Sequence, residues 1–522
     1  MMGKQTSDRK LFYVGFDLEG RVREDNPLRR VRAAIDFSFV REEVAGCYGY
    51  KGNVSVDPEV IVKMMFLLFF DDVSSERELM RVIPERLDYM WFLGYELDDE
   101  IPGHSVLSKA RRRWGAKVFE RLFVRTVAQC VEAGLVHGSK VHVDGSLVEA
   151  NASRESVVKG APELIRALKE AYRRQERKLE EVADEEGEQG SSPGHGGGRH
   201  YEATNDRMVS TTDPDAAMVR QGKGESRPRH KHHRVVDDAR GVITAVTTTP
   251  GDVAENREMM GLIAQHEQNT GRAVETAVGD SQYGTVENFR DCHQRGICSH
   301  MGDLNAKARG KGRRKGIFDE TMFAYDAETD TYRCPAGQVL ARRRHKKKRR
   351  AYEYAAGAKT CAACELRPRC TRSKSGRSVK RHENQEAIDA ERAQSHSVAA
   401  KRDRRRRKHL MEGSFADAAN NHGFKRARWR RLWRQRIQDY LIAAAQNIRI
   451  LLRHTSRKKR ALAQALPAPT PIIRAFHHLL NPLWALTNPL RRVPLPRSPL
   501  GAIAPRTALT SDYALIVAGT AF

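Results

Sequence analysis

Apolar positions recur at helical spacing through the first part of the chain. Asp57-Pro58 makes a cap and first-turn pair for the apolar segment Val60 to Phe70. The run Ser75-Glu76-Arg77-Glu78 has the pattern of a capping box that opens another helix. An amphipathic stretch then extends from Val118 to Val131 and stops at Gly134. These patterns predict an all-helical N-terminal domain.

The spacing changes from helical to alternating at Val141-His142-Val143-Asp144. Successive side chains of a strand point to opposite faces of the sheet, so the two valines share one face and Asp144 lies on the other. A carboxylate on a half-buried strand must be hydrogen-bonded, paired or bound to a metal, because leaving it bare is costly. The alternative is an ordinary turn that Asp144 opens with Gly145.

Two more strands, a helix and a further extended run are expected after this first strand. His230 to Val236 and Val242 to Thr249 form a predicted hairpin, followed by a helix over about 254–266 and an extended run from Ala273 to Val278. This order predicts an α/β fold with a mixed sheet and flanking helices. Asp280 comes at the carboxyl end of the last strand, where such sheets place their ligands. The alternative is that Asp280 caps the following helix.

A cysteine-bearing segment separates these strands from the C-terminal part of the chain. Cys361 and Cys364 form a CxxC pair, with Cys334 before them and Cys370 after them. Four thiolates can hold a tetrahedral structural Zn²⁺, although the outer spacings are not those of a standard ligand pair. The alternative is four free cysteines packed in a small β-rich insertion.

Two long helices are predicted after this insertion. The first begins at about Gln385 and places Arg405, Lys408 and Glu412 on one face. Glu412 beside these cations is either a surface ion pair or a metal-binding carboxylate. The second, from Phe424 to Arg453, has a continuous apolar stripe that predicts a buried face, and its basic remainder is expected to face DNA.

Composition narrows the choice of partners. The chain of 522 residues carries a net charge of +26, which favours a polyanionic partner. Nucleic acid is favoured over an anionic membrane surface, because Arg and Lys contacts to phosphates supply most non-specific affinity. The longest apolar run, Met64 to Phe70, is too short to span a bilayer. The N-terminal residues lack the apolar core of a signal peptide, and eight cysteines in so long a chain do not suggest a disulfide framework. We therefore expect a cytoplasmic, nucleoid-associated protein with no membrane partner.

Asp144, Asp280 and Glu412 together suggest phosphodiester chemistry. Cutting or transferring a phosphodiester needs a strong nucleophile and neutralisation of the charge on the scissile phosphate. Two divalent ions about 3.5–4 Å apart supply both. Carboxylate oxygens suit Mg²⁺ or Mn²⁺. The sequence has no glycine-rich Walker loop, so an ATP-driven reaction is not supported.

Three acidic blocks of the sequence resemble those of bacterial insertion-sequence DDE transposases. The blocks are Val143 to Ser153, Gly279 to Gly284 and Met411 to Phe415. The likeness extends over roughly residues 35–453. It implies an RNase H-like catalytic fold, metal-dependent nicking at the ends of a mobile element, and strand transfer into target DNA.

The resemblance also implies roles for individual residues. Asp144, Asp280 and Glu412 become the catalytic ligands of two Mg²⁺ or Mn²⁺ ions. Related elements often carry a Tyr-Arg-Glu-Lys pattern around the glutamate, where this chain has Arg405, Lys408, Glu412 and Ala419. The residues expected to contact DNA are Arg111, Arg112, Arg113, Arg405, Lys408, Lys425, Arg426, Arg428, Arg430 and Arg431.

The expected partner is double-stranded DNA, as the terminal inverted repeats of the element and as the target, with a homodimer in the synaptic complex. Two other functions compete with transposition. One is a non-catalytic DNA-binding repressor derived from a transposase, and the other is a stand-alone metal-dependent nuclease.

The predicted organisation has five parts. They are a helical N-terminal DNA-binding domain over 1–135, the first part of an RNase H-like core over 136–306 with a helical and glycine-rich insertion at 155–205, a basic cysteine-containing insertion over 307–383, the C-terminal helices of the core over 384–453, and a disordered tail over 454–522.

Overall fold

The computed structural model describes Met2 and residues 17–49, 54–181, 204–302, 316–347 and 350–465. Parts of three predicted segments lie outside these ranges: residues 182–203 of the glycine-rich insertion, residues 307–315 and 348–349 of the basic insertion, and the tail after Ala465.

The described residues before the first strand contain helices joined by turns and short connections. The α-helices are α1 (Leu18–Arg21), α2 (Pro27–Ala34), α3 (Phe39–Val44), α4 (Pro58–Phe70), α5 (Glu76–Val82), α6 (Leu87–Leu93), α7 (Ser105–Trp114) and α8 (Lys117–Glu132). Two predicted caps are confirmed. The Asp57 carboxylate accepts a hydrogen bond from the Glu59 backbone N–H at 3.0 Å, and the Ser75 hydroxyl accepts one from the Glu78 N–H at 3.1 Å.

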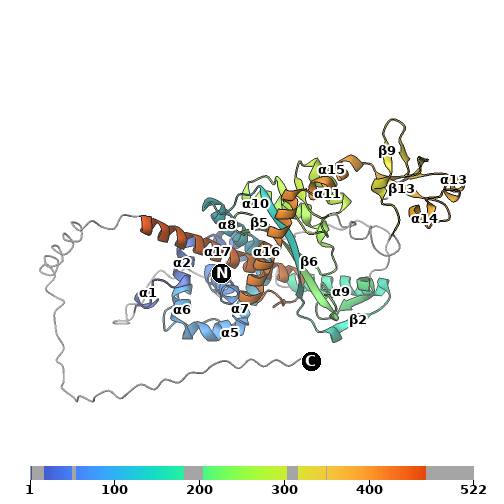
Figure 1. The fold of residues 1–522 in the computed structure, drawn as a ribbon. Coiled ribbons are helices and arrows are strands. Elements are labelled where there is room, and N and C mark those ends of the chain that lie inside the picture. The colour runs from blue at the N-terminus through green and yellow to red at the C-terminus, as the bar shows by residue number, and fades with distance from the viewer. Residues whose placement is uncertain are drawn as a thin grey trace, which may run out of the picture. The chain divides into compact units, whose positions relative to one another are not determined.

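A six-stranded mixed sheet follows these helices (Figure 1). Its strands are β1 (Lys140–Glu149), β4 (Ala217–Arg220), β5 (Ser226–Asp237), β6 (Ile243–Pro250), β7 (Thr276–Val278) and β8 (Cys298–His300). The strand β5 pairs antiparallel with β1 on one side and with β4 and β6 on the other. On its far side β1 pairs parallel with β7, and β7 pairs parallel with β8. The predicted hairpin and mixed sheet are therefore confirmed.

The alternation along β1 assigns its side chains to opposite faces of the sheet. Val141 and Val143 are fully buried in a core that includes residues of α10 (Met259–Thr270), α11 (Val286–Gln294) and α15 (Gln385–Ser395). Asp144 lies on the other face, where it contacts α16 (Val398–Asn421). The face that carries Asp144 is thus covered by a helix from far along the sequence.

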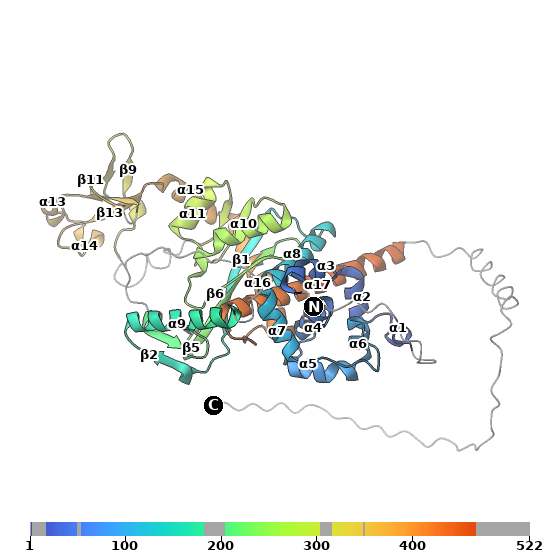
Figure 2. The ribbon, with the colours of Figure 1, turned by 180° about the vertical axis from the view of Figure 1, so that it is seen from behind.

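Between β1 and β4, α9 (Pro162–Glu181) lies beside a small two-stranded sheet of β2 (Val157–Lys159) and β3 (Met208–Ser210), as both views show (Figures 1 and 2). The predicted helical arm is confirmed over the residues that are described.

The cysteine-bearing insertion is a separate antiparallel sheet with the order β13-β12-β11-β10-β9. Its elements are β9 (Ala324–Asp326), β10 (Thr331–Arg333), β11 (Val339–Lys346), β12 (Ala351–Ala355), β13 (Ser378–His382), α13 (Ala358–Ala362) and α14 (Arg367–Cys370). We call residues 316–347 and 350–383 the cysteine module.

Two predicted boundaries in the C-terminal part are wrong. The single helix expected from Gln385 past Met411 is two helices, α15 and α16, because the Ser397 hydroxyl caps a new helix by accepting the Ala400 N–H at 3.0 Å. The last helix, α17 (Leu432–Ala465), begins eight residues after Phe424 and continues past the expected end at Arg453. Phe424 to Arg431 is not helical because its backbone pairs with β1 instead: the Glu149 N–H donates to Lys425 O, and the Ala427 N–H donates to Glu149 O.

The apolar core of the N-terminal helices is continuous with the C-terminal helices. Buried residues of α4, α6 and α8 share one cluster with Met411 of α16 and with Ile437 and Leu441 of α17. Among the described residues, no helix is both long enough and apolar enough to cross a membrane.

Candidate active site

Asp144 is the centre of a cluster of charged side chains on β1. Its Oδ1 lies 2.7 Å from Nη2 of Arg407, and it also accepts a hydrogen bond from the Gly145 backbone N–H at 2.9 Å. The Arg407 side chain enters from α16, and its Nε donates to the Val143 carbonyl at 3.0 Å. One guanidinium therefore binds both the carboxylate and the strand that carries it.

Asp280 reaches the same region from the neighbouring strand. It follows β7 by two residues, and β7 runs parallel beside β1. Its carboxylate accepts a hydrogen bond from the Gln282 N–H at 2.7 Å, which closes a turn just beyond the strand. Asp144 therefore lies on β1, and Asp280 lies just beyond the end of the adjacent parallel strand β7.

Glu255 is a third acid at this site, and it was not among the residues singled out from the sequence. It follows the end of β6, and Lys231 Nζ lies 3.7 Å from its Oε1. Its side chain packs directly on the glycine after Asp144: a Cβ on Gly145 would meet Cγ of Glu255 at 3.0 Å and Oε1 at 3.3 Å. Gly145 thus permits the approach of Glu255 to β1.

The three acids affect one another electrostatically. Burial raises the pKa of Asp144 to about 6, Arg407 and the Gly145 N–H lower it, and Glu255 and Asp280 raise it. Burial also raises the pKa of Glu255, which Lys231 lowers and Asp280 raises. Like charges this close disfavour ionisation of Asp144 and Glu255, so a cation at the site is stabilising.

Arg407 supplies that cation in the structure. Arg407 is 9 % exposed, so its guanidinium is held against Asp144 and away from bulk water. Across the described ranges, no three His, Cys, Asp or Glu side chains stand close enough together to hold a metal ion as they lie. The donor chemistry nevertheless fits a hard cation, because carboxylate oxygens are the ligands that Mg²⁺ and Mn²⁺ prefer.

Glu412 does not join this group in the structure. It lies on α16 five residues after Arg407, which turns it roughly 140° around the helix from the guanidinium. The side chain is exposed, and within the described chain it has no hydrogen bond or ion pair. In the structure, the acids that interact electrostatically with Asp144 are therefore Asp280 and Glu255, and the role predicted for Glu412 stays a prediction.

The basic residues expected to contact DNA divide into two groups. Those with exposed side chains are Arg112, Arg113, Arg405, Lys408, Lys425, Arg426 and Arg430. Lys425 contacts the strand that carries Asp144, because its Nζ donates to the hydroxyl of Ser146 at 3.0 Å.

Three of the predicted DNA contacts are engaged inside the protein. Arg111 is 3 % exposed, forms an ion pair with Glu76 and stacks on the Trp429 ring at 3.9 Å, so its prediction as a DNA contact is wrong for this arrangement. Arg428 is paired with Asp72 at 2.7 Å, and Arg431 is half-buried with its guanidinium 5.9 Å from the Tyr172 ring. The basic runs of the sequence could not predict these contacts, because the contacts are tertiary.

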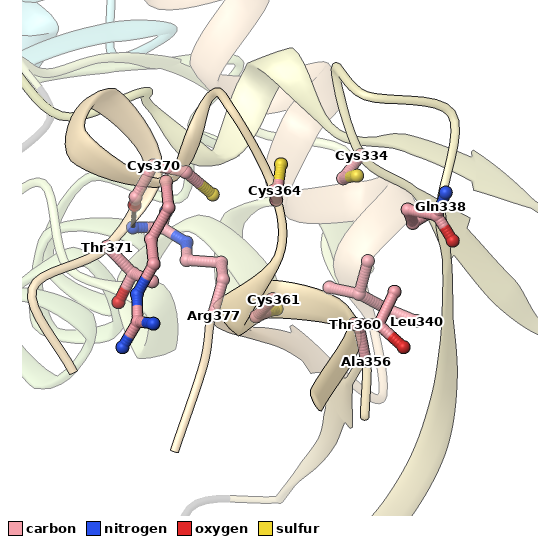
Figure 3. Close-up of a pocket in the computed structure, with 11 residues that line it drawn as sticks. Cys334, Gln338, Leu340, Ala356, Thr360, Cys361, Cys364, Cys370, Thr371 and Arg377 are labelled. Carbon is pink, nitrogen blue, oxygen red and sulfur yellow. Dashed lines mark hydrogen bonds between the residues drawn. The ribbon is translucent and has the colours of Figure 1, made fainter. Parts of the chain in front are cut away.

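Cys334, Cys361, Cys364 and Cys370 line one cavity of the cysteine module (Figure 3). Every described cysteine has a free thiol. The four residues expected to act together are thus brought together by the fold.

Two segments of the chain match family models. Residues 16–113 match a transposase domain (DUF772), and residues 333–452 match a transposase DDE domain. The second match includes the cysteine module from Arg333 onward, α15, α16 and most of α17.

The other comparisons add little. No curated protein matches the chain. Among solved structures, a piggyBac transposase synaptic complex with hairpin DNA is 9 % identical, with 87 % of this chain and 85 % of that chain covered and a TM-score of 0.30. A likeness this slight bears on neither the reaction nor the site.

Proposed function

The chain belongs to the DDE transposases of insertion sequences, since both matched segments are transposase domains, and we propose that it cuts and rejoins DNA at the ends of its own element. The proposed partners are the terminal inverted repeats, the target DNA and a second copy of the chain. The observation that carries the proposal is the grouping of Asp144, Asp280 and Glu255 around a cation on one mixed sheet.

The strand order supports an RNase H-like core. The strands β6, β5 and β1 form an antiparallel meander, and β7 and β8 continue it parallel to β1. Such a sheet places Asp144 in its middle and Asp280 at the end of the adjacent strand. We infer that this arrangement, together with the helices on both faces, is the catalytic fold that the family likeness implies.

Asp144 and Asp280 are the proposed ligands of two Mg²⁺ or Mn²⁺ ions. Bound there, the ions would activate a water or a 3′-hydroxyl and stabilise the leaving oxygen. Asp144 must be ionised and released from Arg407 before its oxygens can serve as ligands. The freed guanidinium can then pair with a phosphate oxygen of the DNA, which keeps positive charge beside the reacting strand.

The third carboxylate is either Glu412 or Glu255. The family likeness favours Glu412, and the geometry favours Glu255, whose carboxylate lies against Gly145. For Glu412 to bind beside Asp144, α16 would have to rotate or shift. Glu255 already lies close enough to Asp144 to raise the pKa of that carboxyl group.

The exposed basic residues supply a path for DNA toward the acids. The backbone of Lys425 to Ala427 continues along the end of β1, and Arg426 and Arg430 are exposed on the same segment. Because phosphate contacts fix the register of DNA without reading its sequence, these residues would position the strand rather than select it.

A plasmid that carries paired element ends tests the proposal. We expect Mg²⁺-dependent excision and insertion by the full chain, none with EDTA, and DNA binding without cleavage by Asp144→Asn and Asp280→Asn. Glu287→Gln, an exposed acid on α11, is the matched control and should remain active. Cutting without rejoining would instead indicate a nuclease, and binding without any metal-dependent chemistry would indicate a repressor; either outcome contradicts the proposal.

The same assay identifies the third ligand. Glu255→Gln and Glu412→Gln are compared at equal DNA binding, with cleavage as the measure. The variant that removes the metal ligand should lose cleavage by a factor of about 100 or more, the loss typical of a missing electrostatic group in a catalytic site. If both variants cleave normally, neither Glu255 nor Glu412 is a metal ligand, and the proposed three-carboxylate site is wrong.

A further inference from the structure

We propose that the cysteine module is held together by one structural Zn²⁺ bound by the thiolates of Cys334, Cys361, Cys364 and Cys370. This site lies outside the proposed active site, and the proposal is independent of whether the chain moves DNA.

The four cysteines come from three different turns of the module. Cys334 opens the turn between β10 and β11, where the Gly337 N–H donates to Cys334 O at 2.8 Å and Gly337 has a positive φ of 75°. Cys361 and Cys364 lie at and just after α13, and Cys370 ends α14. Figure 3 shows their side chains around one cavity. A ligand between them would therefore join all three turns.

The size of the cavity limits what could occupy it. Its volume is about 20 Å³, which is close to the space needed by a single water. A single metal ion fits such a space. Thiolate donors favour Zn²⁺ over the hard cations, and four protein ligands leave no open position for catalysis.

Arg377 points to a negative charge in the same place. It lines the cavity, and one guanidinium N–H donates to Cys370 O at 3.4 Å. Its Nε is buried and has no hydrogen-bond partner within the described residues. A buried donor without a partner is costly, and a tetrathiolate site, with its net negative charge, would supply the missing acceptor.

The apolar core and the helices of the module stabilise the turns that carry the cysteines only weakly. Its buried apolar cluster has only six members, Phe323, Tyr332, Leu340, Tyr354, Ala356 and Val379. The helices α13 and α14 are five and four residues long, and helices this short are not stable alone. Small modules of this kind commonly depend on a metal or a disulfide.

The described rotamers do not yet form a coordination shell, since no three candidate ligands in the described chain stand close enough for a metal. Each cysteine has a single side-chain torsion with three staggered positions, so the sulfurs can turn inward without moving the backbone far. Gly376, whose φ is 90°, lets the chain pass the Cys361 sulfur, because a Cβ there would meet Sγ at 2.9 Å.

Metal analysis of the full chain tests the proposal. Protein expressed with zinc in the medium and desalted under reducing conditions should contain about one zinc per chain by plasma mass spectrometry. A Cys361→Ser/Cys364→Ser variant should retain about tenfold less, whereas Cys47→Ser, an exposed cysteine outside the module, should retain all of it. Asp144→Asn should also retain the zinc, which separates this site from the proposed active site.

A second readout identifies the ligands and does not require the variant to fold. The wild-type chain, stripped of metal and loaded with Co²⁺, should show the intense thiolate charge-transfer and tetrahedral d–d absorption bands. Zinc-free wild-type protein, iron in place of zinc, a Cys361–Cys364 disulfide in the purified chain, or full zinc retention by the double variant would each overturn the proposal.

Discussion

Asp144 is a partly buried acid with two acidic neighbours, and Arg407 balances its charge. Burial raises the pKa of its carboxyl group to about 6, against the lowering effect of Arg407. A carboxyl group that protonates so near neutral pH is available to a metal only after it loses the proton. Protons, the guanidinium and a divalent ion therefore compete for the same oxygens.

The pH dependence of metal binding follows from this competition. Because the raised pKa leaves Asp144 fully charged only above about 6, metal affinity is complete above that pH and is lost as the pH falls through it. We expect Mn²⁺ affinity of the full chain, measured by calorimetry, to fall about tenfold per pH unit below this point. An affinity that stays constant down to about pH 4, the ordinary range of an aspartate, would contradict the assigned role.

Replacing Arg407 should move this transition. Arg407→Gln removes the cation that lowers the pKa of Asp144, so the midpoint of Mn²⁺ binding should shift to higher pH. Arg406→Gln is the matched control, because Arg406 lies next to it on α16 but forms its ion pair with Asp238. A shift to lower pH in the Arg407 variant, or an equal shift in both, would contradict the account.

Sequence pattern located two of the three acids near the cation and missed the third. Asp144 and Asp280 could be predicted because Asp144 lies on a strand and Asp280 follows one, and the sequence pattern of each strand indicates extended structure. Glu255 could not, since nothing local distinguishes it: its place depends on how β6 returns along β5 and on the absence of a side chain at Gly145. The exposure of Glu412 depends on which face α16 turns toward the sheet. The sequence of α16 does not predict that face, because arginines occur on every side of the helix.

At the scale of elements, features that depend on residues close together in the sequence were predicted correctly. Features that depend on tertiary contacts were not. The caps at Asp57 and Ser75 involve hydrogen bonds within three residues and were predictable. The non-helical stretch before α17 depends on pairing with β1, about 280 residues earlier in the chain, as the bonds between Glu149 and the segment from Lys425 to Ala427 show. Hydrophobic spacing alone had favoured a helix there.

The contact of α7 with the segment before α17 yields a stability prediction. Arg111 is buried between Glu76 and the Trp429 ring, and the Trp429 Nε1 donates to Glu76 at 3.1 Å. Arg111→Ala leaves Glu76 without its main partner and should cost about 3 kcal/mol of unfolding free energy, measured by chemical denaturation.

The neighbouring Arg112 supplies the control for that experiment. Because Arg112 is exposed, Arg112→Ala should change stability by less than about 0.5 kcal/mol and should weaken DNA binding instead. Equal loss of stability in both variants would mean that the burial of Arg111 has no special role.

At the scale of the whole molecule, one apolar cluster joins the N-terminal helices to α16 and α17, and the chain carries a large positive charge. The charge of +26 belongs to the full sequence, and from composition alone it predicts an anionic partner. Composition could not show which arginines form ion pairs within the protein, as Arg111 and Arg428 do. The continuity between the N-terminal helices and α17 likewise could not be inferred from domain-like changes in the sequence.

The salt dependence of DNA binding tests which charges face the nucleic acid. Arg405→Ala and Lys408→Ala, both exposed on α16, should each reduce the slope of log K against log salt by about one unit. Arg81→Ala is the control, because Arg81 pairs with Glu78 and Glu85 on α5, and its slope should not change. Unchanged slopes for both α16 variants would place the DNA elsewhere.

Iron-directed cleavage of the protein backbone is the most direct test of the metal site. Fe²⁺ that replaces Mg²⁺ cuts the chain next to the bound ion when ascorbate and peroxide are added. We predict cuts beside Asp144 and Asp280 and at either Glu255 or Glu412, all suppressed by excess Mg²⁺ and absent in Asp144→Asn. Backbone cuts that spare both aspartates, or that excess Mg²⁺ does not suppress, would contradict the convergence of these acids on a divalent ion.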